Sequence, residues 1–274
     1  MNIVYNASEV ASLINKNPYK SQEESIEDVI CRIKKQKNMR DINKFNVISK
    51  EELVKFLELF RTESLLDEKV YKDIKKTVKK TDKKEDISKI SKELFEKVSK
   101  ESIEHKNVEK SKDAQKKLES KMDKIMNQKD MKNVKEYVGG FINKQRGIKN
   151  EDNIRKTYEK INKSKVTNNN DCLYKKLIFN INDISFYICG KIDGIENNEL
   201  IEIKNRRNHL FTFIPEYEKI QTEIYLRLTN LKKGKLIQNY NETQSSFDLA
   251  IDNKLWDMII SELKKVSYNI INEL

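Results

Sequence analysis

Apolar residues near the start of the chain recur at intervals of three and four, the spacing that places side chains on one face of a helix. Two such stripes are Ile26, Val29, Ile30 and Ile33, then Leu53, Phe56, Leu57 and Phe60. They predict amphipathic helices within residues 22–60 that pack into a helical core. Residues 5–21 precede them as a short N-terminal motif, in which Pro18 keeps the residue before it extended.

The pattern weakens between about residues 67 and 135, where lysine and acidic residues dominate. No glycine precedes Gly139 and no proline lies between Pro18 and Pro215, so this part predicts long helices. One further stripe consists of Ile87, Ile90, Leu94 and Val98. Acidic residues offset the lysines within 104–130, which favours a solvated helical insertion there. A basic arm that grips DNA is the alternative.

The pattern changes again after Gly139 and Gly140, which predict a break between a helical region, residues 1–138, and a core, residues 139–274. The first region contains the N-terminal motif and a charged insertion at about 61–138. The core reads as a helix at about 150–163, a polar loop at 167–171, strands within 174–204, a helix at 215–231, strands at 235–240 and 247–251, and a last helix from Asn253. This order predicts an α/β fold, a mixed sheet flanked by helices, with a helix-rich N-terminal half.

Two strand signals within the core carry candidate chemistry. Ile184–Asp193 is rich in β-branched and aromatic residues, and 201–204 alternates apolar and charged residues. If the two segments pair as a hairpin, Asp193 lies close to Glu202 and Lys204, because alternate strand residues share a face. An ordinary half-buried strand next to an Asp-Gly turn reads the same way.

Two carboxylates at a sheet edge suit a hard divalent cation, which prefers oxygen ligands. Such a cation activates water and neutralises charge on phosphorus. A lysine on the same face orients that water or stabilises the transition state. The spacing of Asp193, Glu202 and Lys204 therefore points to phosphodiester hydrolysis.

The flanking helices add three polar candidates. Glu151 falls in the first turn of the helix predicted at 150–163, where an acidic residue also complements the helix dipole. Gln221 and Tyr225 stand four apart on the helix after Pro215 and so share a face. A solvated glutamine and a half-buried tyrosine are the ordinary interpretation of that pair.

These elements together resemble the pattern of the PD-(D/E)XK nucleases. The residues that carry this resemblance are Glu151, the run GKIDG at 190–194, EIK at 202–204, and Gln221 with Tyr225. More narrowly, NASEVASLINKNPYKS near the N-terminus and IEIKNRRNHLF with IPEYEKIQTEIYLRL resemble the YqaJ-like viral recombinases. Their relatives include the lambda-type exonucleases, and the sequence looks most similar to the versions in large DNA viruses. The similarity spans residues 5–21 and about 140–260.

The resemblance implies a restriction-endonuclease-like core that binds Mg²⁺ or Mn²⁺. Asp193 and Glu202 would hold the metal with the carbonyl of Ile203, and Glu151 would reach the same centre. Lys204 would be the catalytic lysine.

The resemblance also implies a set of DNA contacts. Gln221 and Tyr225 would contact DNA or support the lysine. Ser8 matches a serine near the DNA end, although a serine before a short helix is often an N-cap. Apart from the resemblance, Arg206 and Arg207 come directly after the strand of Glu202 and Lys204, and this position favours phosphate contacts, which forked guanidinium groups suit, over an ordinary exposed loop.

The amino-acid composition limits which binding partners and cofactors are expected. With 55 Lys and Arg against 44 Asp and Glu, the net charge of +11 indicates a polyanion, and duplex DNA is the simplest. Cys31, Cys172 and Cys189 form no CxxC motif and read as reduced thiols of an intracellular protein, in the host cytoplasm or nucleus if viral. Two histidines argue against an ordinary zinc site. No glycine-rich phosphate loop or long apolar stretch is seen, so neither ATP nor a membrane is expected.

The sequence therefore predicts a metal-dependent DNA nuclease, and the resemblance specifies an exonuclease acting at duplex ends in viral recombination or replication. A structure-specific or nicking endonuclease is one alternative, and a non-catalytic basic DNA-binding protein is another. Cleavage polarity, metal preference and a homo-oligomeric state stay open. Residues 61–138 could clamp DNA or bind a partner such as a single-strand annealing protein.

Overall fold

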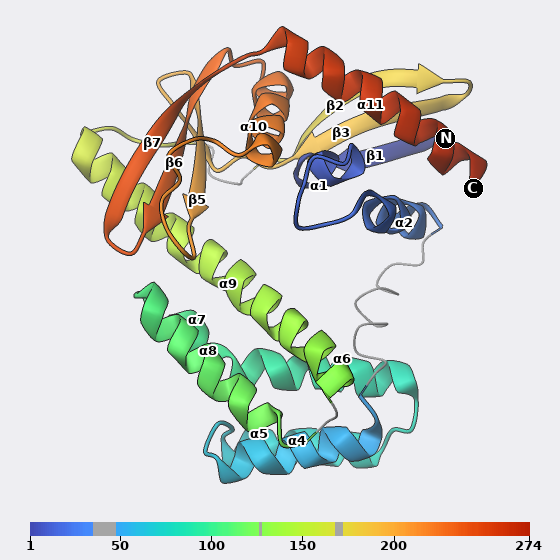
Figure 1. Cartoon of the computed structure of the whole chain (residues 1–274), viewed down its shortest axis with the longest axis vertical. Coiled ribbons are helices and arrows are strands. Elements are labelled where there is room, and N and C mark those ends of the chain that lie inside the picture. The colour runs from blue at the N-terminus through green and yellow to red at the C-terminus, as the bar shows by residue number, and fades with distance from the viewer. Residues whose placement is uncertain (35–47, 126–127, 168–171) are drawn as a thin grey trace. The chain divides into compact units, whose positions relative to one another are not determined.

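The computed structural model of the chain describes residues 1–34, 48–125, 128–167 and 172–274 (Figure 1). Two compact units make up the chain: residues 1–37 with 151–274, and residues 38–150. The expected mixed α/β class and the helix-rich N-terminal half are confirmed. The boundary expected at Gly139 and Gly140 differs from this division, because both glycines lie inside helix α9, Gln128–Asn162.

The first unit holds two sheets rather than one. Its strands are β1 Asn2–Asn6, β2 Tyr174–Ile181, β3 Ile184–Gly190, β4 Gly194–Glu196, β5 Glu199–Asn205, β6 Lys233–Tyr240 and β7 Thr243–Ala250. One sheet has the order β1-β3-β2 and the other β4-β5-β6-β7. Each contains a parallel pair, β1 with β3 and β5 with β6, beside antiparallel pairs.

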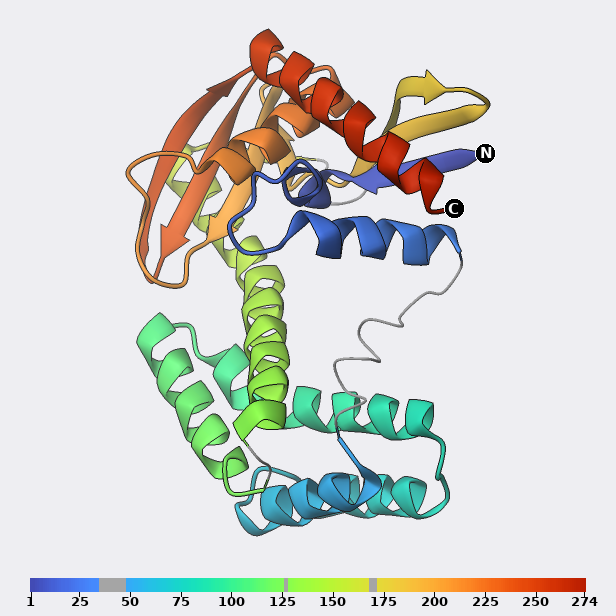
Figure 2. The same cartoon turned by 45° about the vertical axis from the view of Figure 1, so that its right-hand side comes forward.

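Helices cover both sheets of the first unit. They are α1 Ala7–Leu13, α2 Gln22–Ile33, α10 Glu216–Thr229, α11 Asn253–Asn272 and the last part of α9. Helix α10 contacts strands of both sheets and lies between them in the two views (Figures 1 and 2). The helices expected after Pro215 and from Asn253 are confirmed. In the part of the chain that the structure describes, no helix has the length and apolar character needed to cross a membrane.

The hairpin that carries the candidate chemistry forms from a different strand than expected. The run predicted as one strand to Asp193 stops at Gly190, and β3 joins the other sheet. The three residues of β4 pair with β5 instead, through Asn197 and Asn198, whose φ angles are 47° and 65°. Asparagine tolerates this left-handed region, so the two residues close a tight turn.

Strand β5 is buried on both faces. Ile201 and Ile203 pack with Ile154 and Tyr158 of α9. The alternate residues face the other way, where Leu200 joins the core that includes α10. Carboxylate and lysine side chains at 202 and 204 therefore sit on the α10 face of the sheet.

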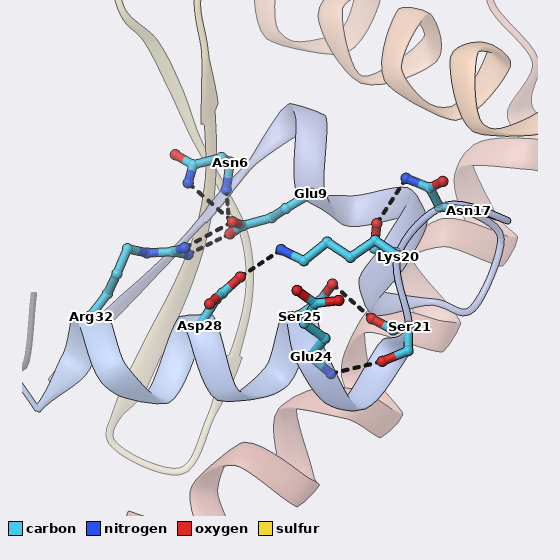
Figure 3. Close-up of polar contacts among 10 residues, drawn as sticks. Asn6, Glu9, Asn17, Lys20, Ser21, Glu24, Ser25, Asp28 and Arg32 are labelled. Carbon is cyan, nitrogen blue, oxygen red and sulfur yellow. Dashed lines mark hydrogen bonds and ion pairs between the residues drawn. The ribbon is translucent and has the colours of Figure 1, made fainter. Parts of the chain in front are cut away.

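The N-terminal segment is tied to α2 by polar contacts (Figure 3). Asn6 caps α1, and the Glu9 carboxylate accepts from the Asn6 backbone N–H at 2.9 Å. The same carboxylate accepts from Arg32 on α2, with Nη1 to Oε2 at 2.8 Å. Lys20 Nζ lies 2.5 Å from Asp28 Oδ2 of α2. These contacts fix β1, α1 and α2 as one piece beside β3.

The second unit is helical. Its described helices are α4 Lys50–Thr62, α5 Glu68–Lys79, α6 Lys84–Val98, α7 Lys100–Glu104, α8 Val108–Met122 and the first part of α9. The predicted stripes of α4 and α6 are buried in its core. The stretch 104–130, expected to be solvated, also supplies core residues, since Leu118 and Met122 are buried. Its lysines lie on the outer face of α8. Their number made the apolar stripe on the inner face difficult to recognise in the sequence.

Candidate active site

Asp193 and Glu202 come together at the carboxyl end of the β4–β5 hairpin. Gly194 pairs with Ile201, so the preceding Asp193 lies beside Glu202. Asp193 Oδ2 accepts from the backbone N–H of Ile203 at 2.6 Å. That hydrogen bond fixes one carboxylate against the strand that carries the other.

A chain of hydrogen bonds connects Glu202 to α10. Lys204 Nζ donates to Glu202 Oε1 at 2.8 Å and to Gln221 Oε1 at 3.0 Å. Gln221 Nε2 in turn donates to Tyr225 Oη at 2.9 Å. The structure therefore brings together five of the predicted site residues: Asp193, Glu202, Lys204, Gln221 and Tyr225.

Burial makes this cluster electrostatically unusual. Glu202 is 2% exposed, and this burial together with the charge of Asp193 raises the pKa of its carboxyl to about 8. Burial alone would lower the pKa of Lys204, but the charges of Glu202 and Asp193 outweigh it and raise that pKa. Lys204 is therefore a cation at neutral pH, suited to donate hydrogen bonds rather than to take a proton.

The donor set fits a hard divalent cation. Glu202 Oε2 is buried and has no hydrogen-bond partner, and Asp193 lies on the same side of the hairpin. Oxygen ligands from two carboxylates and the Ile203 carbonyl are the kind that Mg²⁺ takes, with water completing the shell. The described residues hold no group of three or more His, Cys, Asp or Glu placed to bind a metal.

Glu151 lies in α9, whose residues Ile154 and Tyr158 pack on the other face of the sheet. It is not in a first helical turn and stands one turn before Ile154. Gln244 Nε2 donates to the Ile154 carbonyl, and Tyr158 Oη donates to Glu196 Oε2. Glu196 is at the β4–β5 turn, beside the first residue of β5, whereas Gln244 pairs through β6 with the last residue of β5. Helix α9 therefore runs antiparallel to β5.

This direction puts Glu151 toward the carboxyl end of β5, where Lys204 lies, rather than toward the turn. Its side chain is partly exposed. The expected role of Glu151 at the metal centre stays a prediction.

Arg206 does not have the expected position for a phosphate contact. Its guanidinium is 8% exposed and forms a fork with Glu218, with Nη2 to Oε2 at 2.8 Å. Its Nε donates to Gln238 Oε1 at 2.9 Å, and Phe211 lies under the group. Arg206 therefore holds β5, α10 and β6 together. Arg207 is partly exposed, and its predicted phosphate contact stays a prediction.

Ser8 is exposed in the first turn of α1, where Asn6 rather than Ser8 is the N-cap. Its neighbour Ala7 lies close to the site: a Cβ on Gly190 would stand 3.0 Å from Ala7 Cβ and 2.7 Å from Tyr225 Cε1. Gly190 thus leaves room for the Tyr225 ring. The predicted DNA contact of Ser8 is untested by this geometry.

Two residues near the site were not singled out from the sequence. Tyr217 precedes Gln221 by four positions and so extends the stripe formed with Tyr225, a spacing visible in the sequence. Glu218 is buried and pairs with Arg206. A glutamate in a first helical turn gives no sequence signal for such burial.

Parts of the chain are similar to solved structures at low sequence identity. No family model matches the chain, and neither does any curated protein. A solved structure titled SSO0001 aligns over 43% of this chain and 55% of its own, with 17% identity and a TM-score of 0.35. An alkaline exonuclease from Laribacter hongkongensis aligns over 47% of this chain and 69% of its own, with 18% identity and a TM-score of 0.39.

The dAMP complex of that exonuclease has the same identity and TM-score, covering 68% of its own chain. The present chain thus spans 55% of the first of these structures and just over two thirds of the others. At such TM-scores the similarities carry no functional assignment.

Proposed function

We propose that the chain is a metal-dependent DNA nuclease, an exonuclease that hydrolyses phosphodiester bonds at duplex ends. The observation that carries the proposal is the buried Glu202, which has one oxygen bonded to Lys204 and the other without a partner beside Asp193. Buried carboxylates of raised pKa in such a pair are typical of functional sites. The net charge of +11 supports a polyanionic substrate.

The roles follow from the contacts. Asp193 and Glu202 would hold Mg²⁺ or Mn²⁺ with the Ile203 carbonyl, and the metal would supply an activated water and charge neutralisation at phosphorus. The Lys204 ammonium, aimed by Gln221, donates a hydrogen bond toward the attacked phosphate or the attacking water. Tyr225 holds the Gln221 amide in place. Glu151 would complete the acidic surroundings of the water.

A duplex labelled at its 5′ or 3′ end tests the proposal. The wild type is incubated with Mg²⁺, with Mn²⁺ and with EDTA, next to Lys204→Ala. Lys265→Ala is the matched control, because that lysine side chain is 69% exposed on α11. We expect metal-dependent release of label that Lys204→Ala abolishes and Lys265→Ala leaves unchanged, and the released products give the polarity.

The alternatives predict other results. Cleavage of a closed circular duplex would favour the endonuclease. Binding of duplex without cleavage in either metal would contradict the nuclease and leave a basic DNA-binding protein.

A further inference from the structure

An aromatic pair stands at the protein surface close to the candidate active site. Tyr19 is 77% exposed, and its ring meets Tyr217 edge-on, with centroids 5.7 Å apart and planes at 84°. Tyr217 is half-buried on α10. Burying a tyrosine ring would be favourable, so a ring held in water by an ordered loop suggests a use for its exposed face.

The loop that carries Tyr19 is held by side-chain hydrogen bonds. The Tyr19 backbone N–H donates to Asn17 Oδ1 at 2.9 Å, and Asn17 Nδ2 donates to Ser12 Oγ at 3.0 Å. On the other side, Lys20 pairs with Asp28 of α2 (Figure 3). The backbone of Tyr19 is thus held from both directions, and its ring contacts Tyr217.

Tyr217 of this pair lies on the same face of α10 as Gln221 and Tyr225 of the candidate active site. Tyr217 and Gln221 are four apart on α10, so about one helical turn of 5.4 Å separates them along the axis. Gln221 Oε1 accepts from Lys204. Next to Tyr217, at the start of α10, Glu216 forms an ion pair with the 40% exposed Lys16, with Nζ to Oε1 at 3.1 Å.

We propose that Tyr19, backed by Tyr217, stacks an unpaired base of the DNA strand bound at Lys204. This inference rests on the proposed function and names its substrate class: duplex DNA whose end carries a single-stranded tail. Base stacking on an aromatic ring is tolerant of sequence, because every base has a π-face. The ring would therefore hold any unpaired base next to the scissile region.

Binding measured in EDTA tests the inference without cleavage. The probe is a duplex with a short oligo(dT) tail that carries 2-aminopurine as an unpaired base, and a blunt duplex is the comparison. Fluorescence anisotropy gives the Kd, and quenching of 2-aminopurine reports stacking. The variants are Tyr19→Ala, Tyr19→Phe and the matched control Tyr268→Ala, a tyrosine 56% exposed on α11.

We expect Tyr19→Ala to raise the Kd for the tailed duplex by about fivefold to a hundredfold and to remove the quenching. Tyr19→Phe keeps the ring and should bind like the wild type, as should Tyr268→Ala. The blunt duplex should bind all variants alike. Equal tail binding and equal quenching by Tyr19→Ala and the wild type would overturn the inference, as would a wild type without preference for the tail.

The two proposals fail separately. Cleavage by the wild type together with unaltered tail binding by Tyr19→Ala would refute the stacking role and leave the nuclease. Loss of quenching in Tyr19→Ala, in a protein that cleaves no substrate, would refute the nuclease and leave a base-stacking site on a DNA-binding protein.

Discussion

At the scale of single residues, Gln221 is engaged at both ends of its amide. Its carbonyl oxygen accepts from Lys204 and its NH₂ group donates to Tyr225 Oη. An amide that is hydrogen-bonded at both ends has one orientation. That orientation turns the carbonyl oxygen of Gln221, rather than its NH₂ group, toward the Lys204 ammonium. Gln221 is thus a positioning residue for the lysine.

We expect Gln221→Ala to lower the single-turnover cleavage rate by about ten- to a hundredfold, the range found for residues that orient a catalytic centre. A role through Lys204 predicts little change in KM, whereas a direct contact of this amide with DNA would raise KM. Tyr225→Phe removes only the hydroxyl and should cost less. A wild-type rate for Gln221→Ala, or a loss that comes only from a raised KM, would contradict the positioning role.

Gly190 controls the room for Tyr225. An added methyl would stand 2.7 Å from the ring, which is 6% exposed and cannot swing into water. We expect Gly190→Ala to lower the free energy of unfolding by about 1–3 kcal/mol, as overpacking does, and to slow cleavage through Tyr225. Chemical denaturation measures the first effect.

Gly140→Ala is the matched control for that substitution. Gly140 is exposed in α9, and an added methyl meets nothing within 4 Å. Alanine should therefore stabilise the helix by up to about 1 kcal/mol. A stabilising Gly190→Ala would show that the Tyr225 ring is not tightly held.

The sequence predicted five residues that the structure brings together, but it could not distinguish adjacent residues of the same type. Arg206 and Arg207 are adjacent arginines, and both were expected to bind phosphate. The period of two along β5 continues to Arg206, which places it on the α10 face with Glu202 and Lys204. The acceptor that buries it, Glu218, comes from another element, so burial could not be predicted from the strand alone.

At the scale of elements, the Arg206–Glu218 pair joins the end of β5 to the first turn of α10. Both side chains are under a tenth exposed, and Gln238 of β6 adds an acceptor. Removing one partner of such a pair leaves a buried charge without compensation. Lys204 is on β5 and Gln221 is on α10. The distance between their side chains therefore depends on the ion pair that connects these two elements.

We expect Arg206→Ala to lower the free energy of unfolding by about 3–5 kcal/mol. Arg207 is partly exposed, so Arg207→Ala should lower stability less than Arg206→Ala does, and it should weaken DNA binding, with a reduced slope of log Kd against log salt. Thermal unfolding and salt-dependent binding of the two variants give the comparison. An Arg206→Ala protein of normal stability would refute the structural role.

Strand existence was easier to predict than strand partners. The run from Ile184 to Asp193 reads as one strand because β propensity continues through it. Its partners are β1, from the start of the chain, and β2, so it belongs to another sheet. Only three residues, β4, remain to pair with β5. The alternation of apolar and polar residues along a strand shows which side chains share a face of the sheet. It does not show which strand is the hydrogen-bonded partner, least of all a parallel one about 180 residues away.

At the scale of the whole molecule, the two units have separate hydrophobic cores. Phe56, Phe60 and Phe95 meet in the core of the second unit, with ring centroids 5.3–6.1 Å apart. The core around β3, β5 and α10 contains none of them. Each unit can therefore respond separately to a packing defect.

Phe95→Ala tests that separation. Truncating this fully buried ring should cost the second unit about 3–5 kcal/mol. Hydrogen exchange should then speed up in α4, α5 and α6 and stay unchanged in β3 and β5. Ile188→Ala, in β3, should give the reverse pattern. Faster exchange throughout both units in either variant would show one cooperative structure instead.

The pairing of β1 with β3 also determines the order of events during synthesis. Asn2 pairs with Ser185, so the N-terminal strand leaves the ribosome 183 residues before its partner. At about 5–20 residues per second, that is a wait of roughly ten to forty seconds. The helical unit, encoded between the two strands, can fold in that interval, while β1 and α1 remain without their sheet. A chaperone that binds nascent apolar segments would therefore have that interval in which to bind residues 3–13.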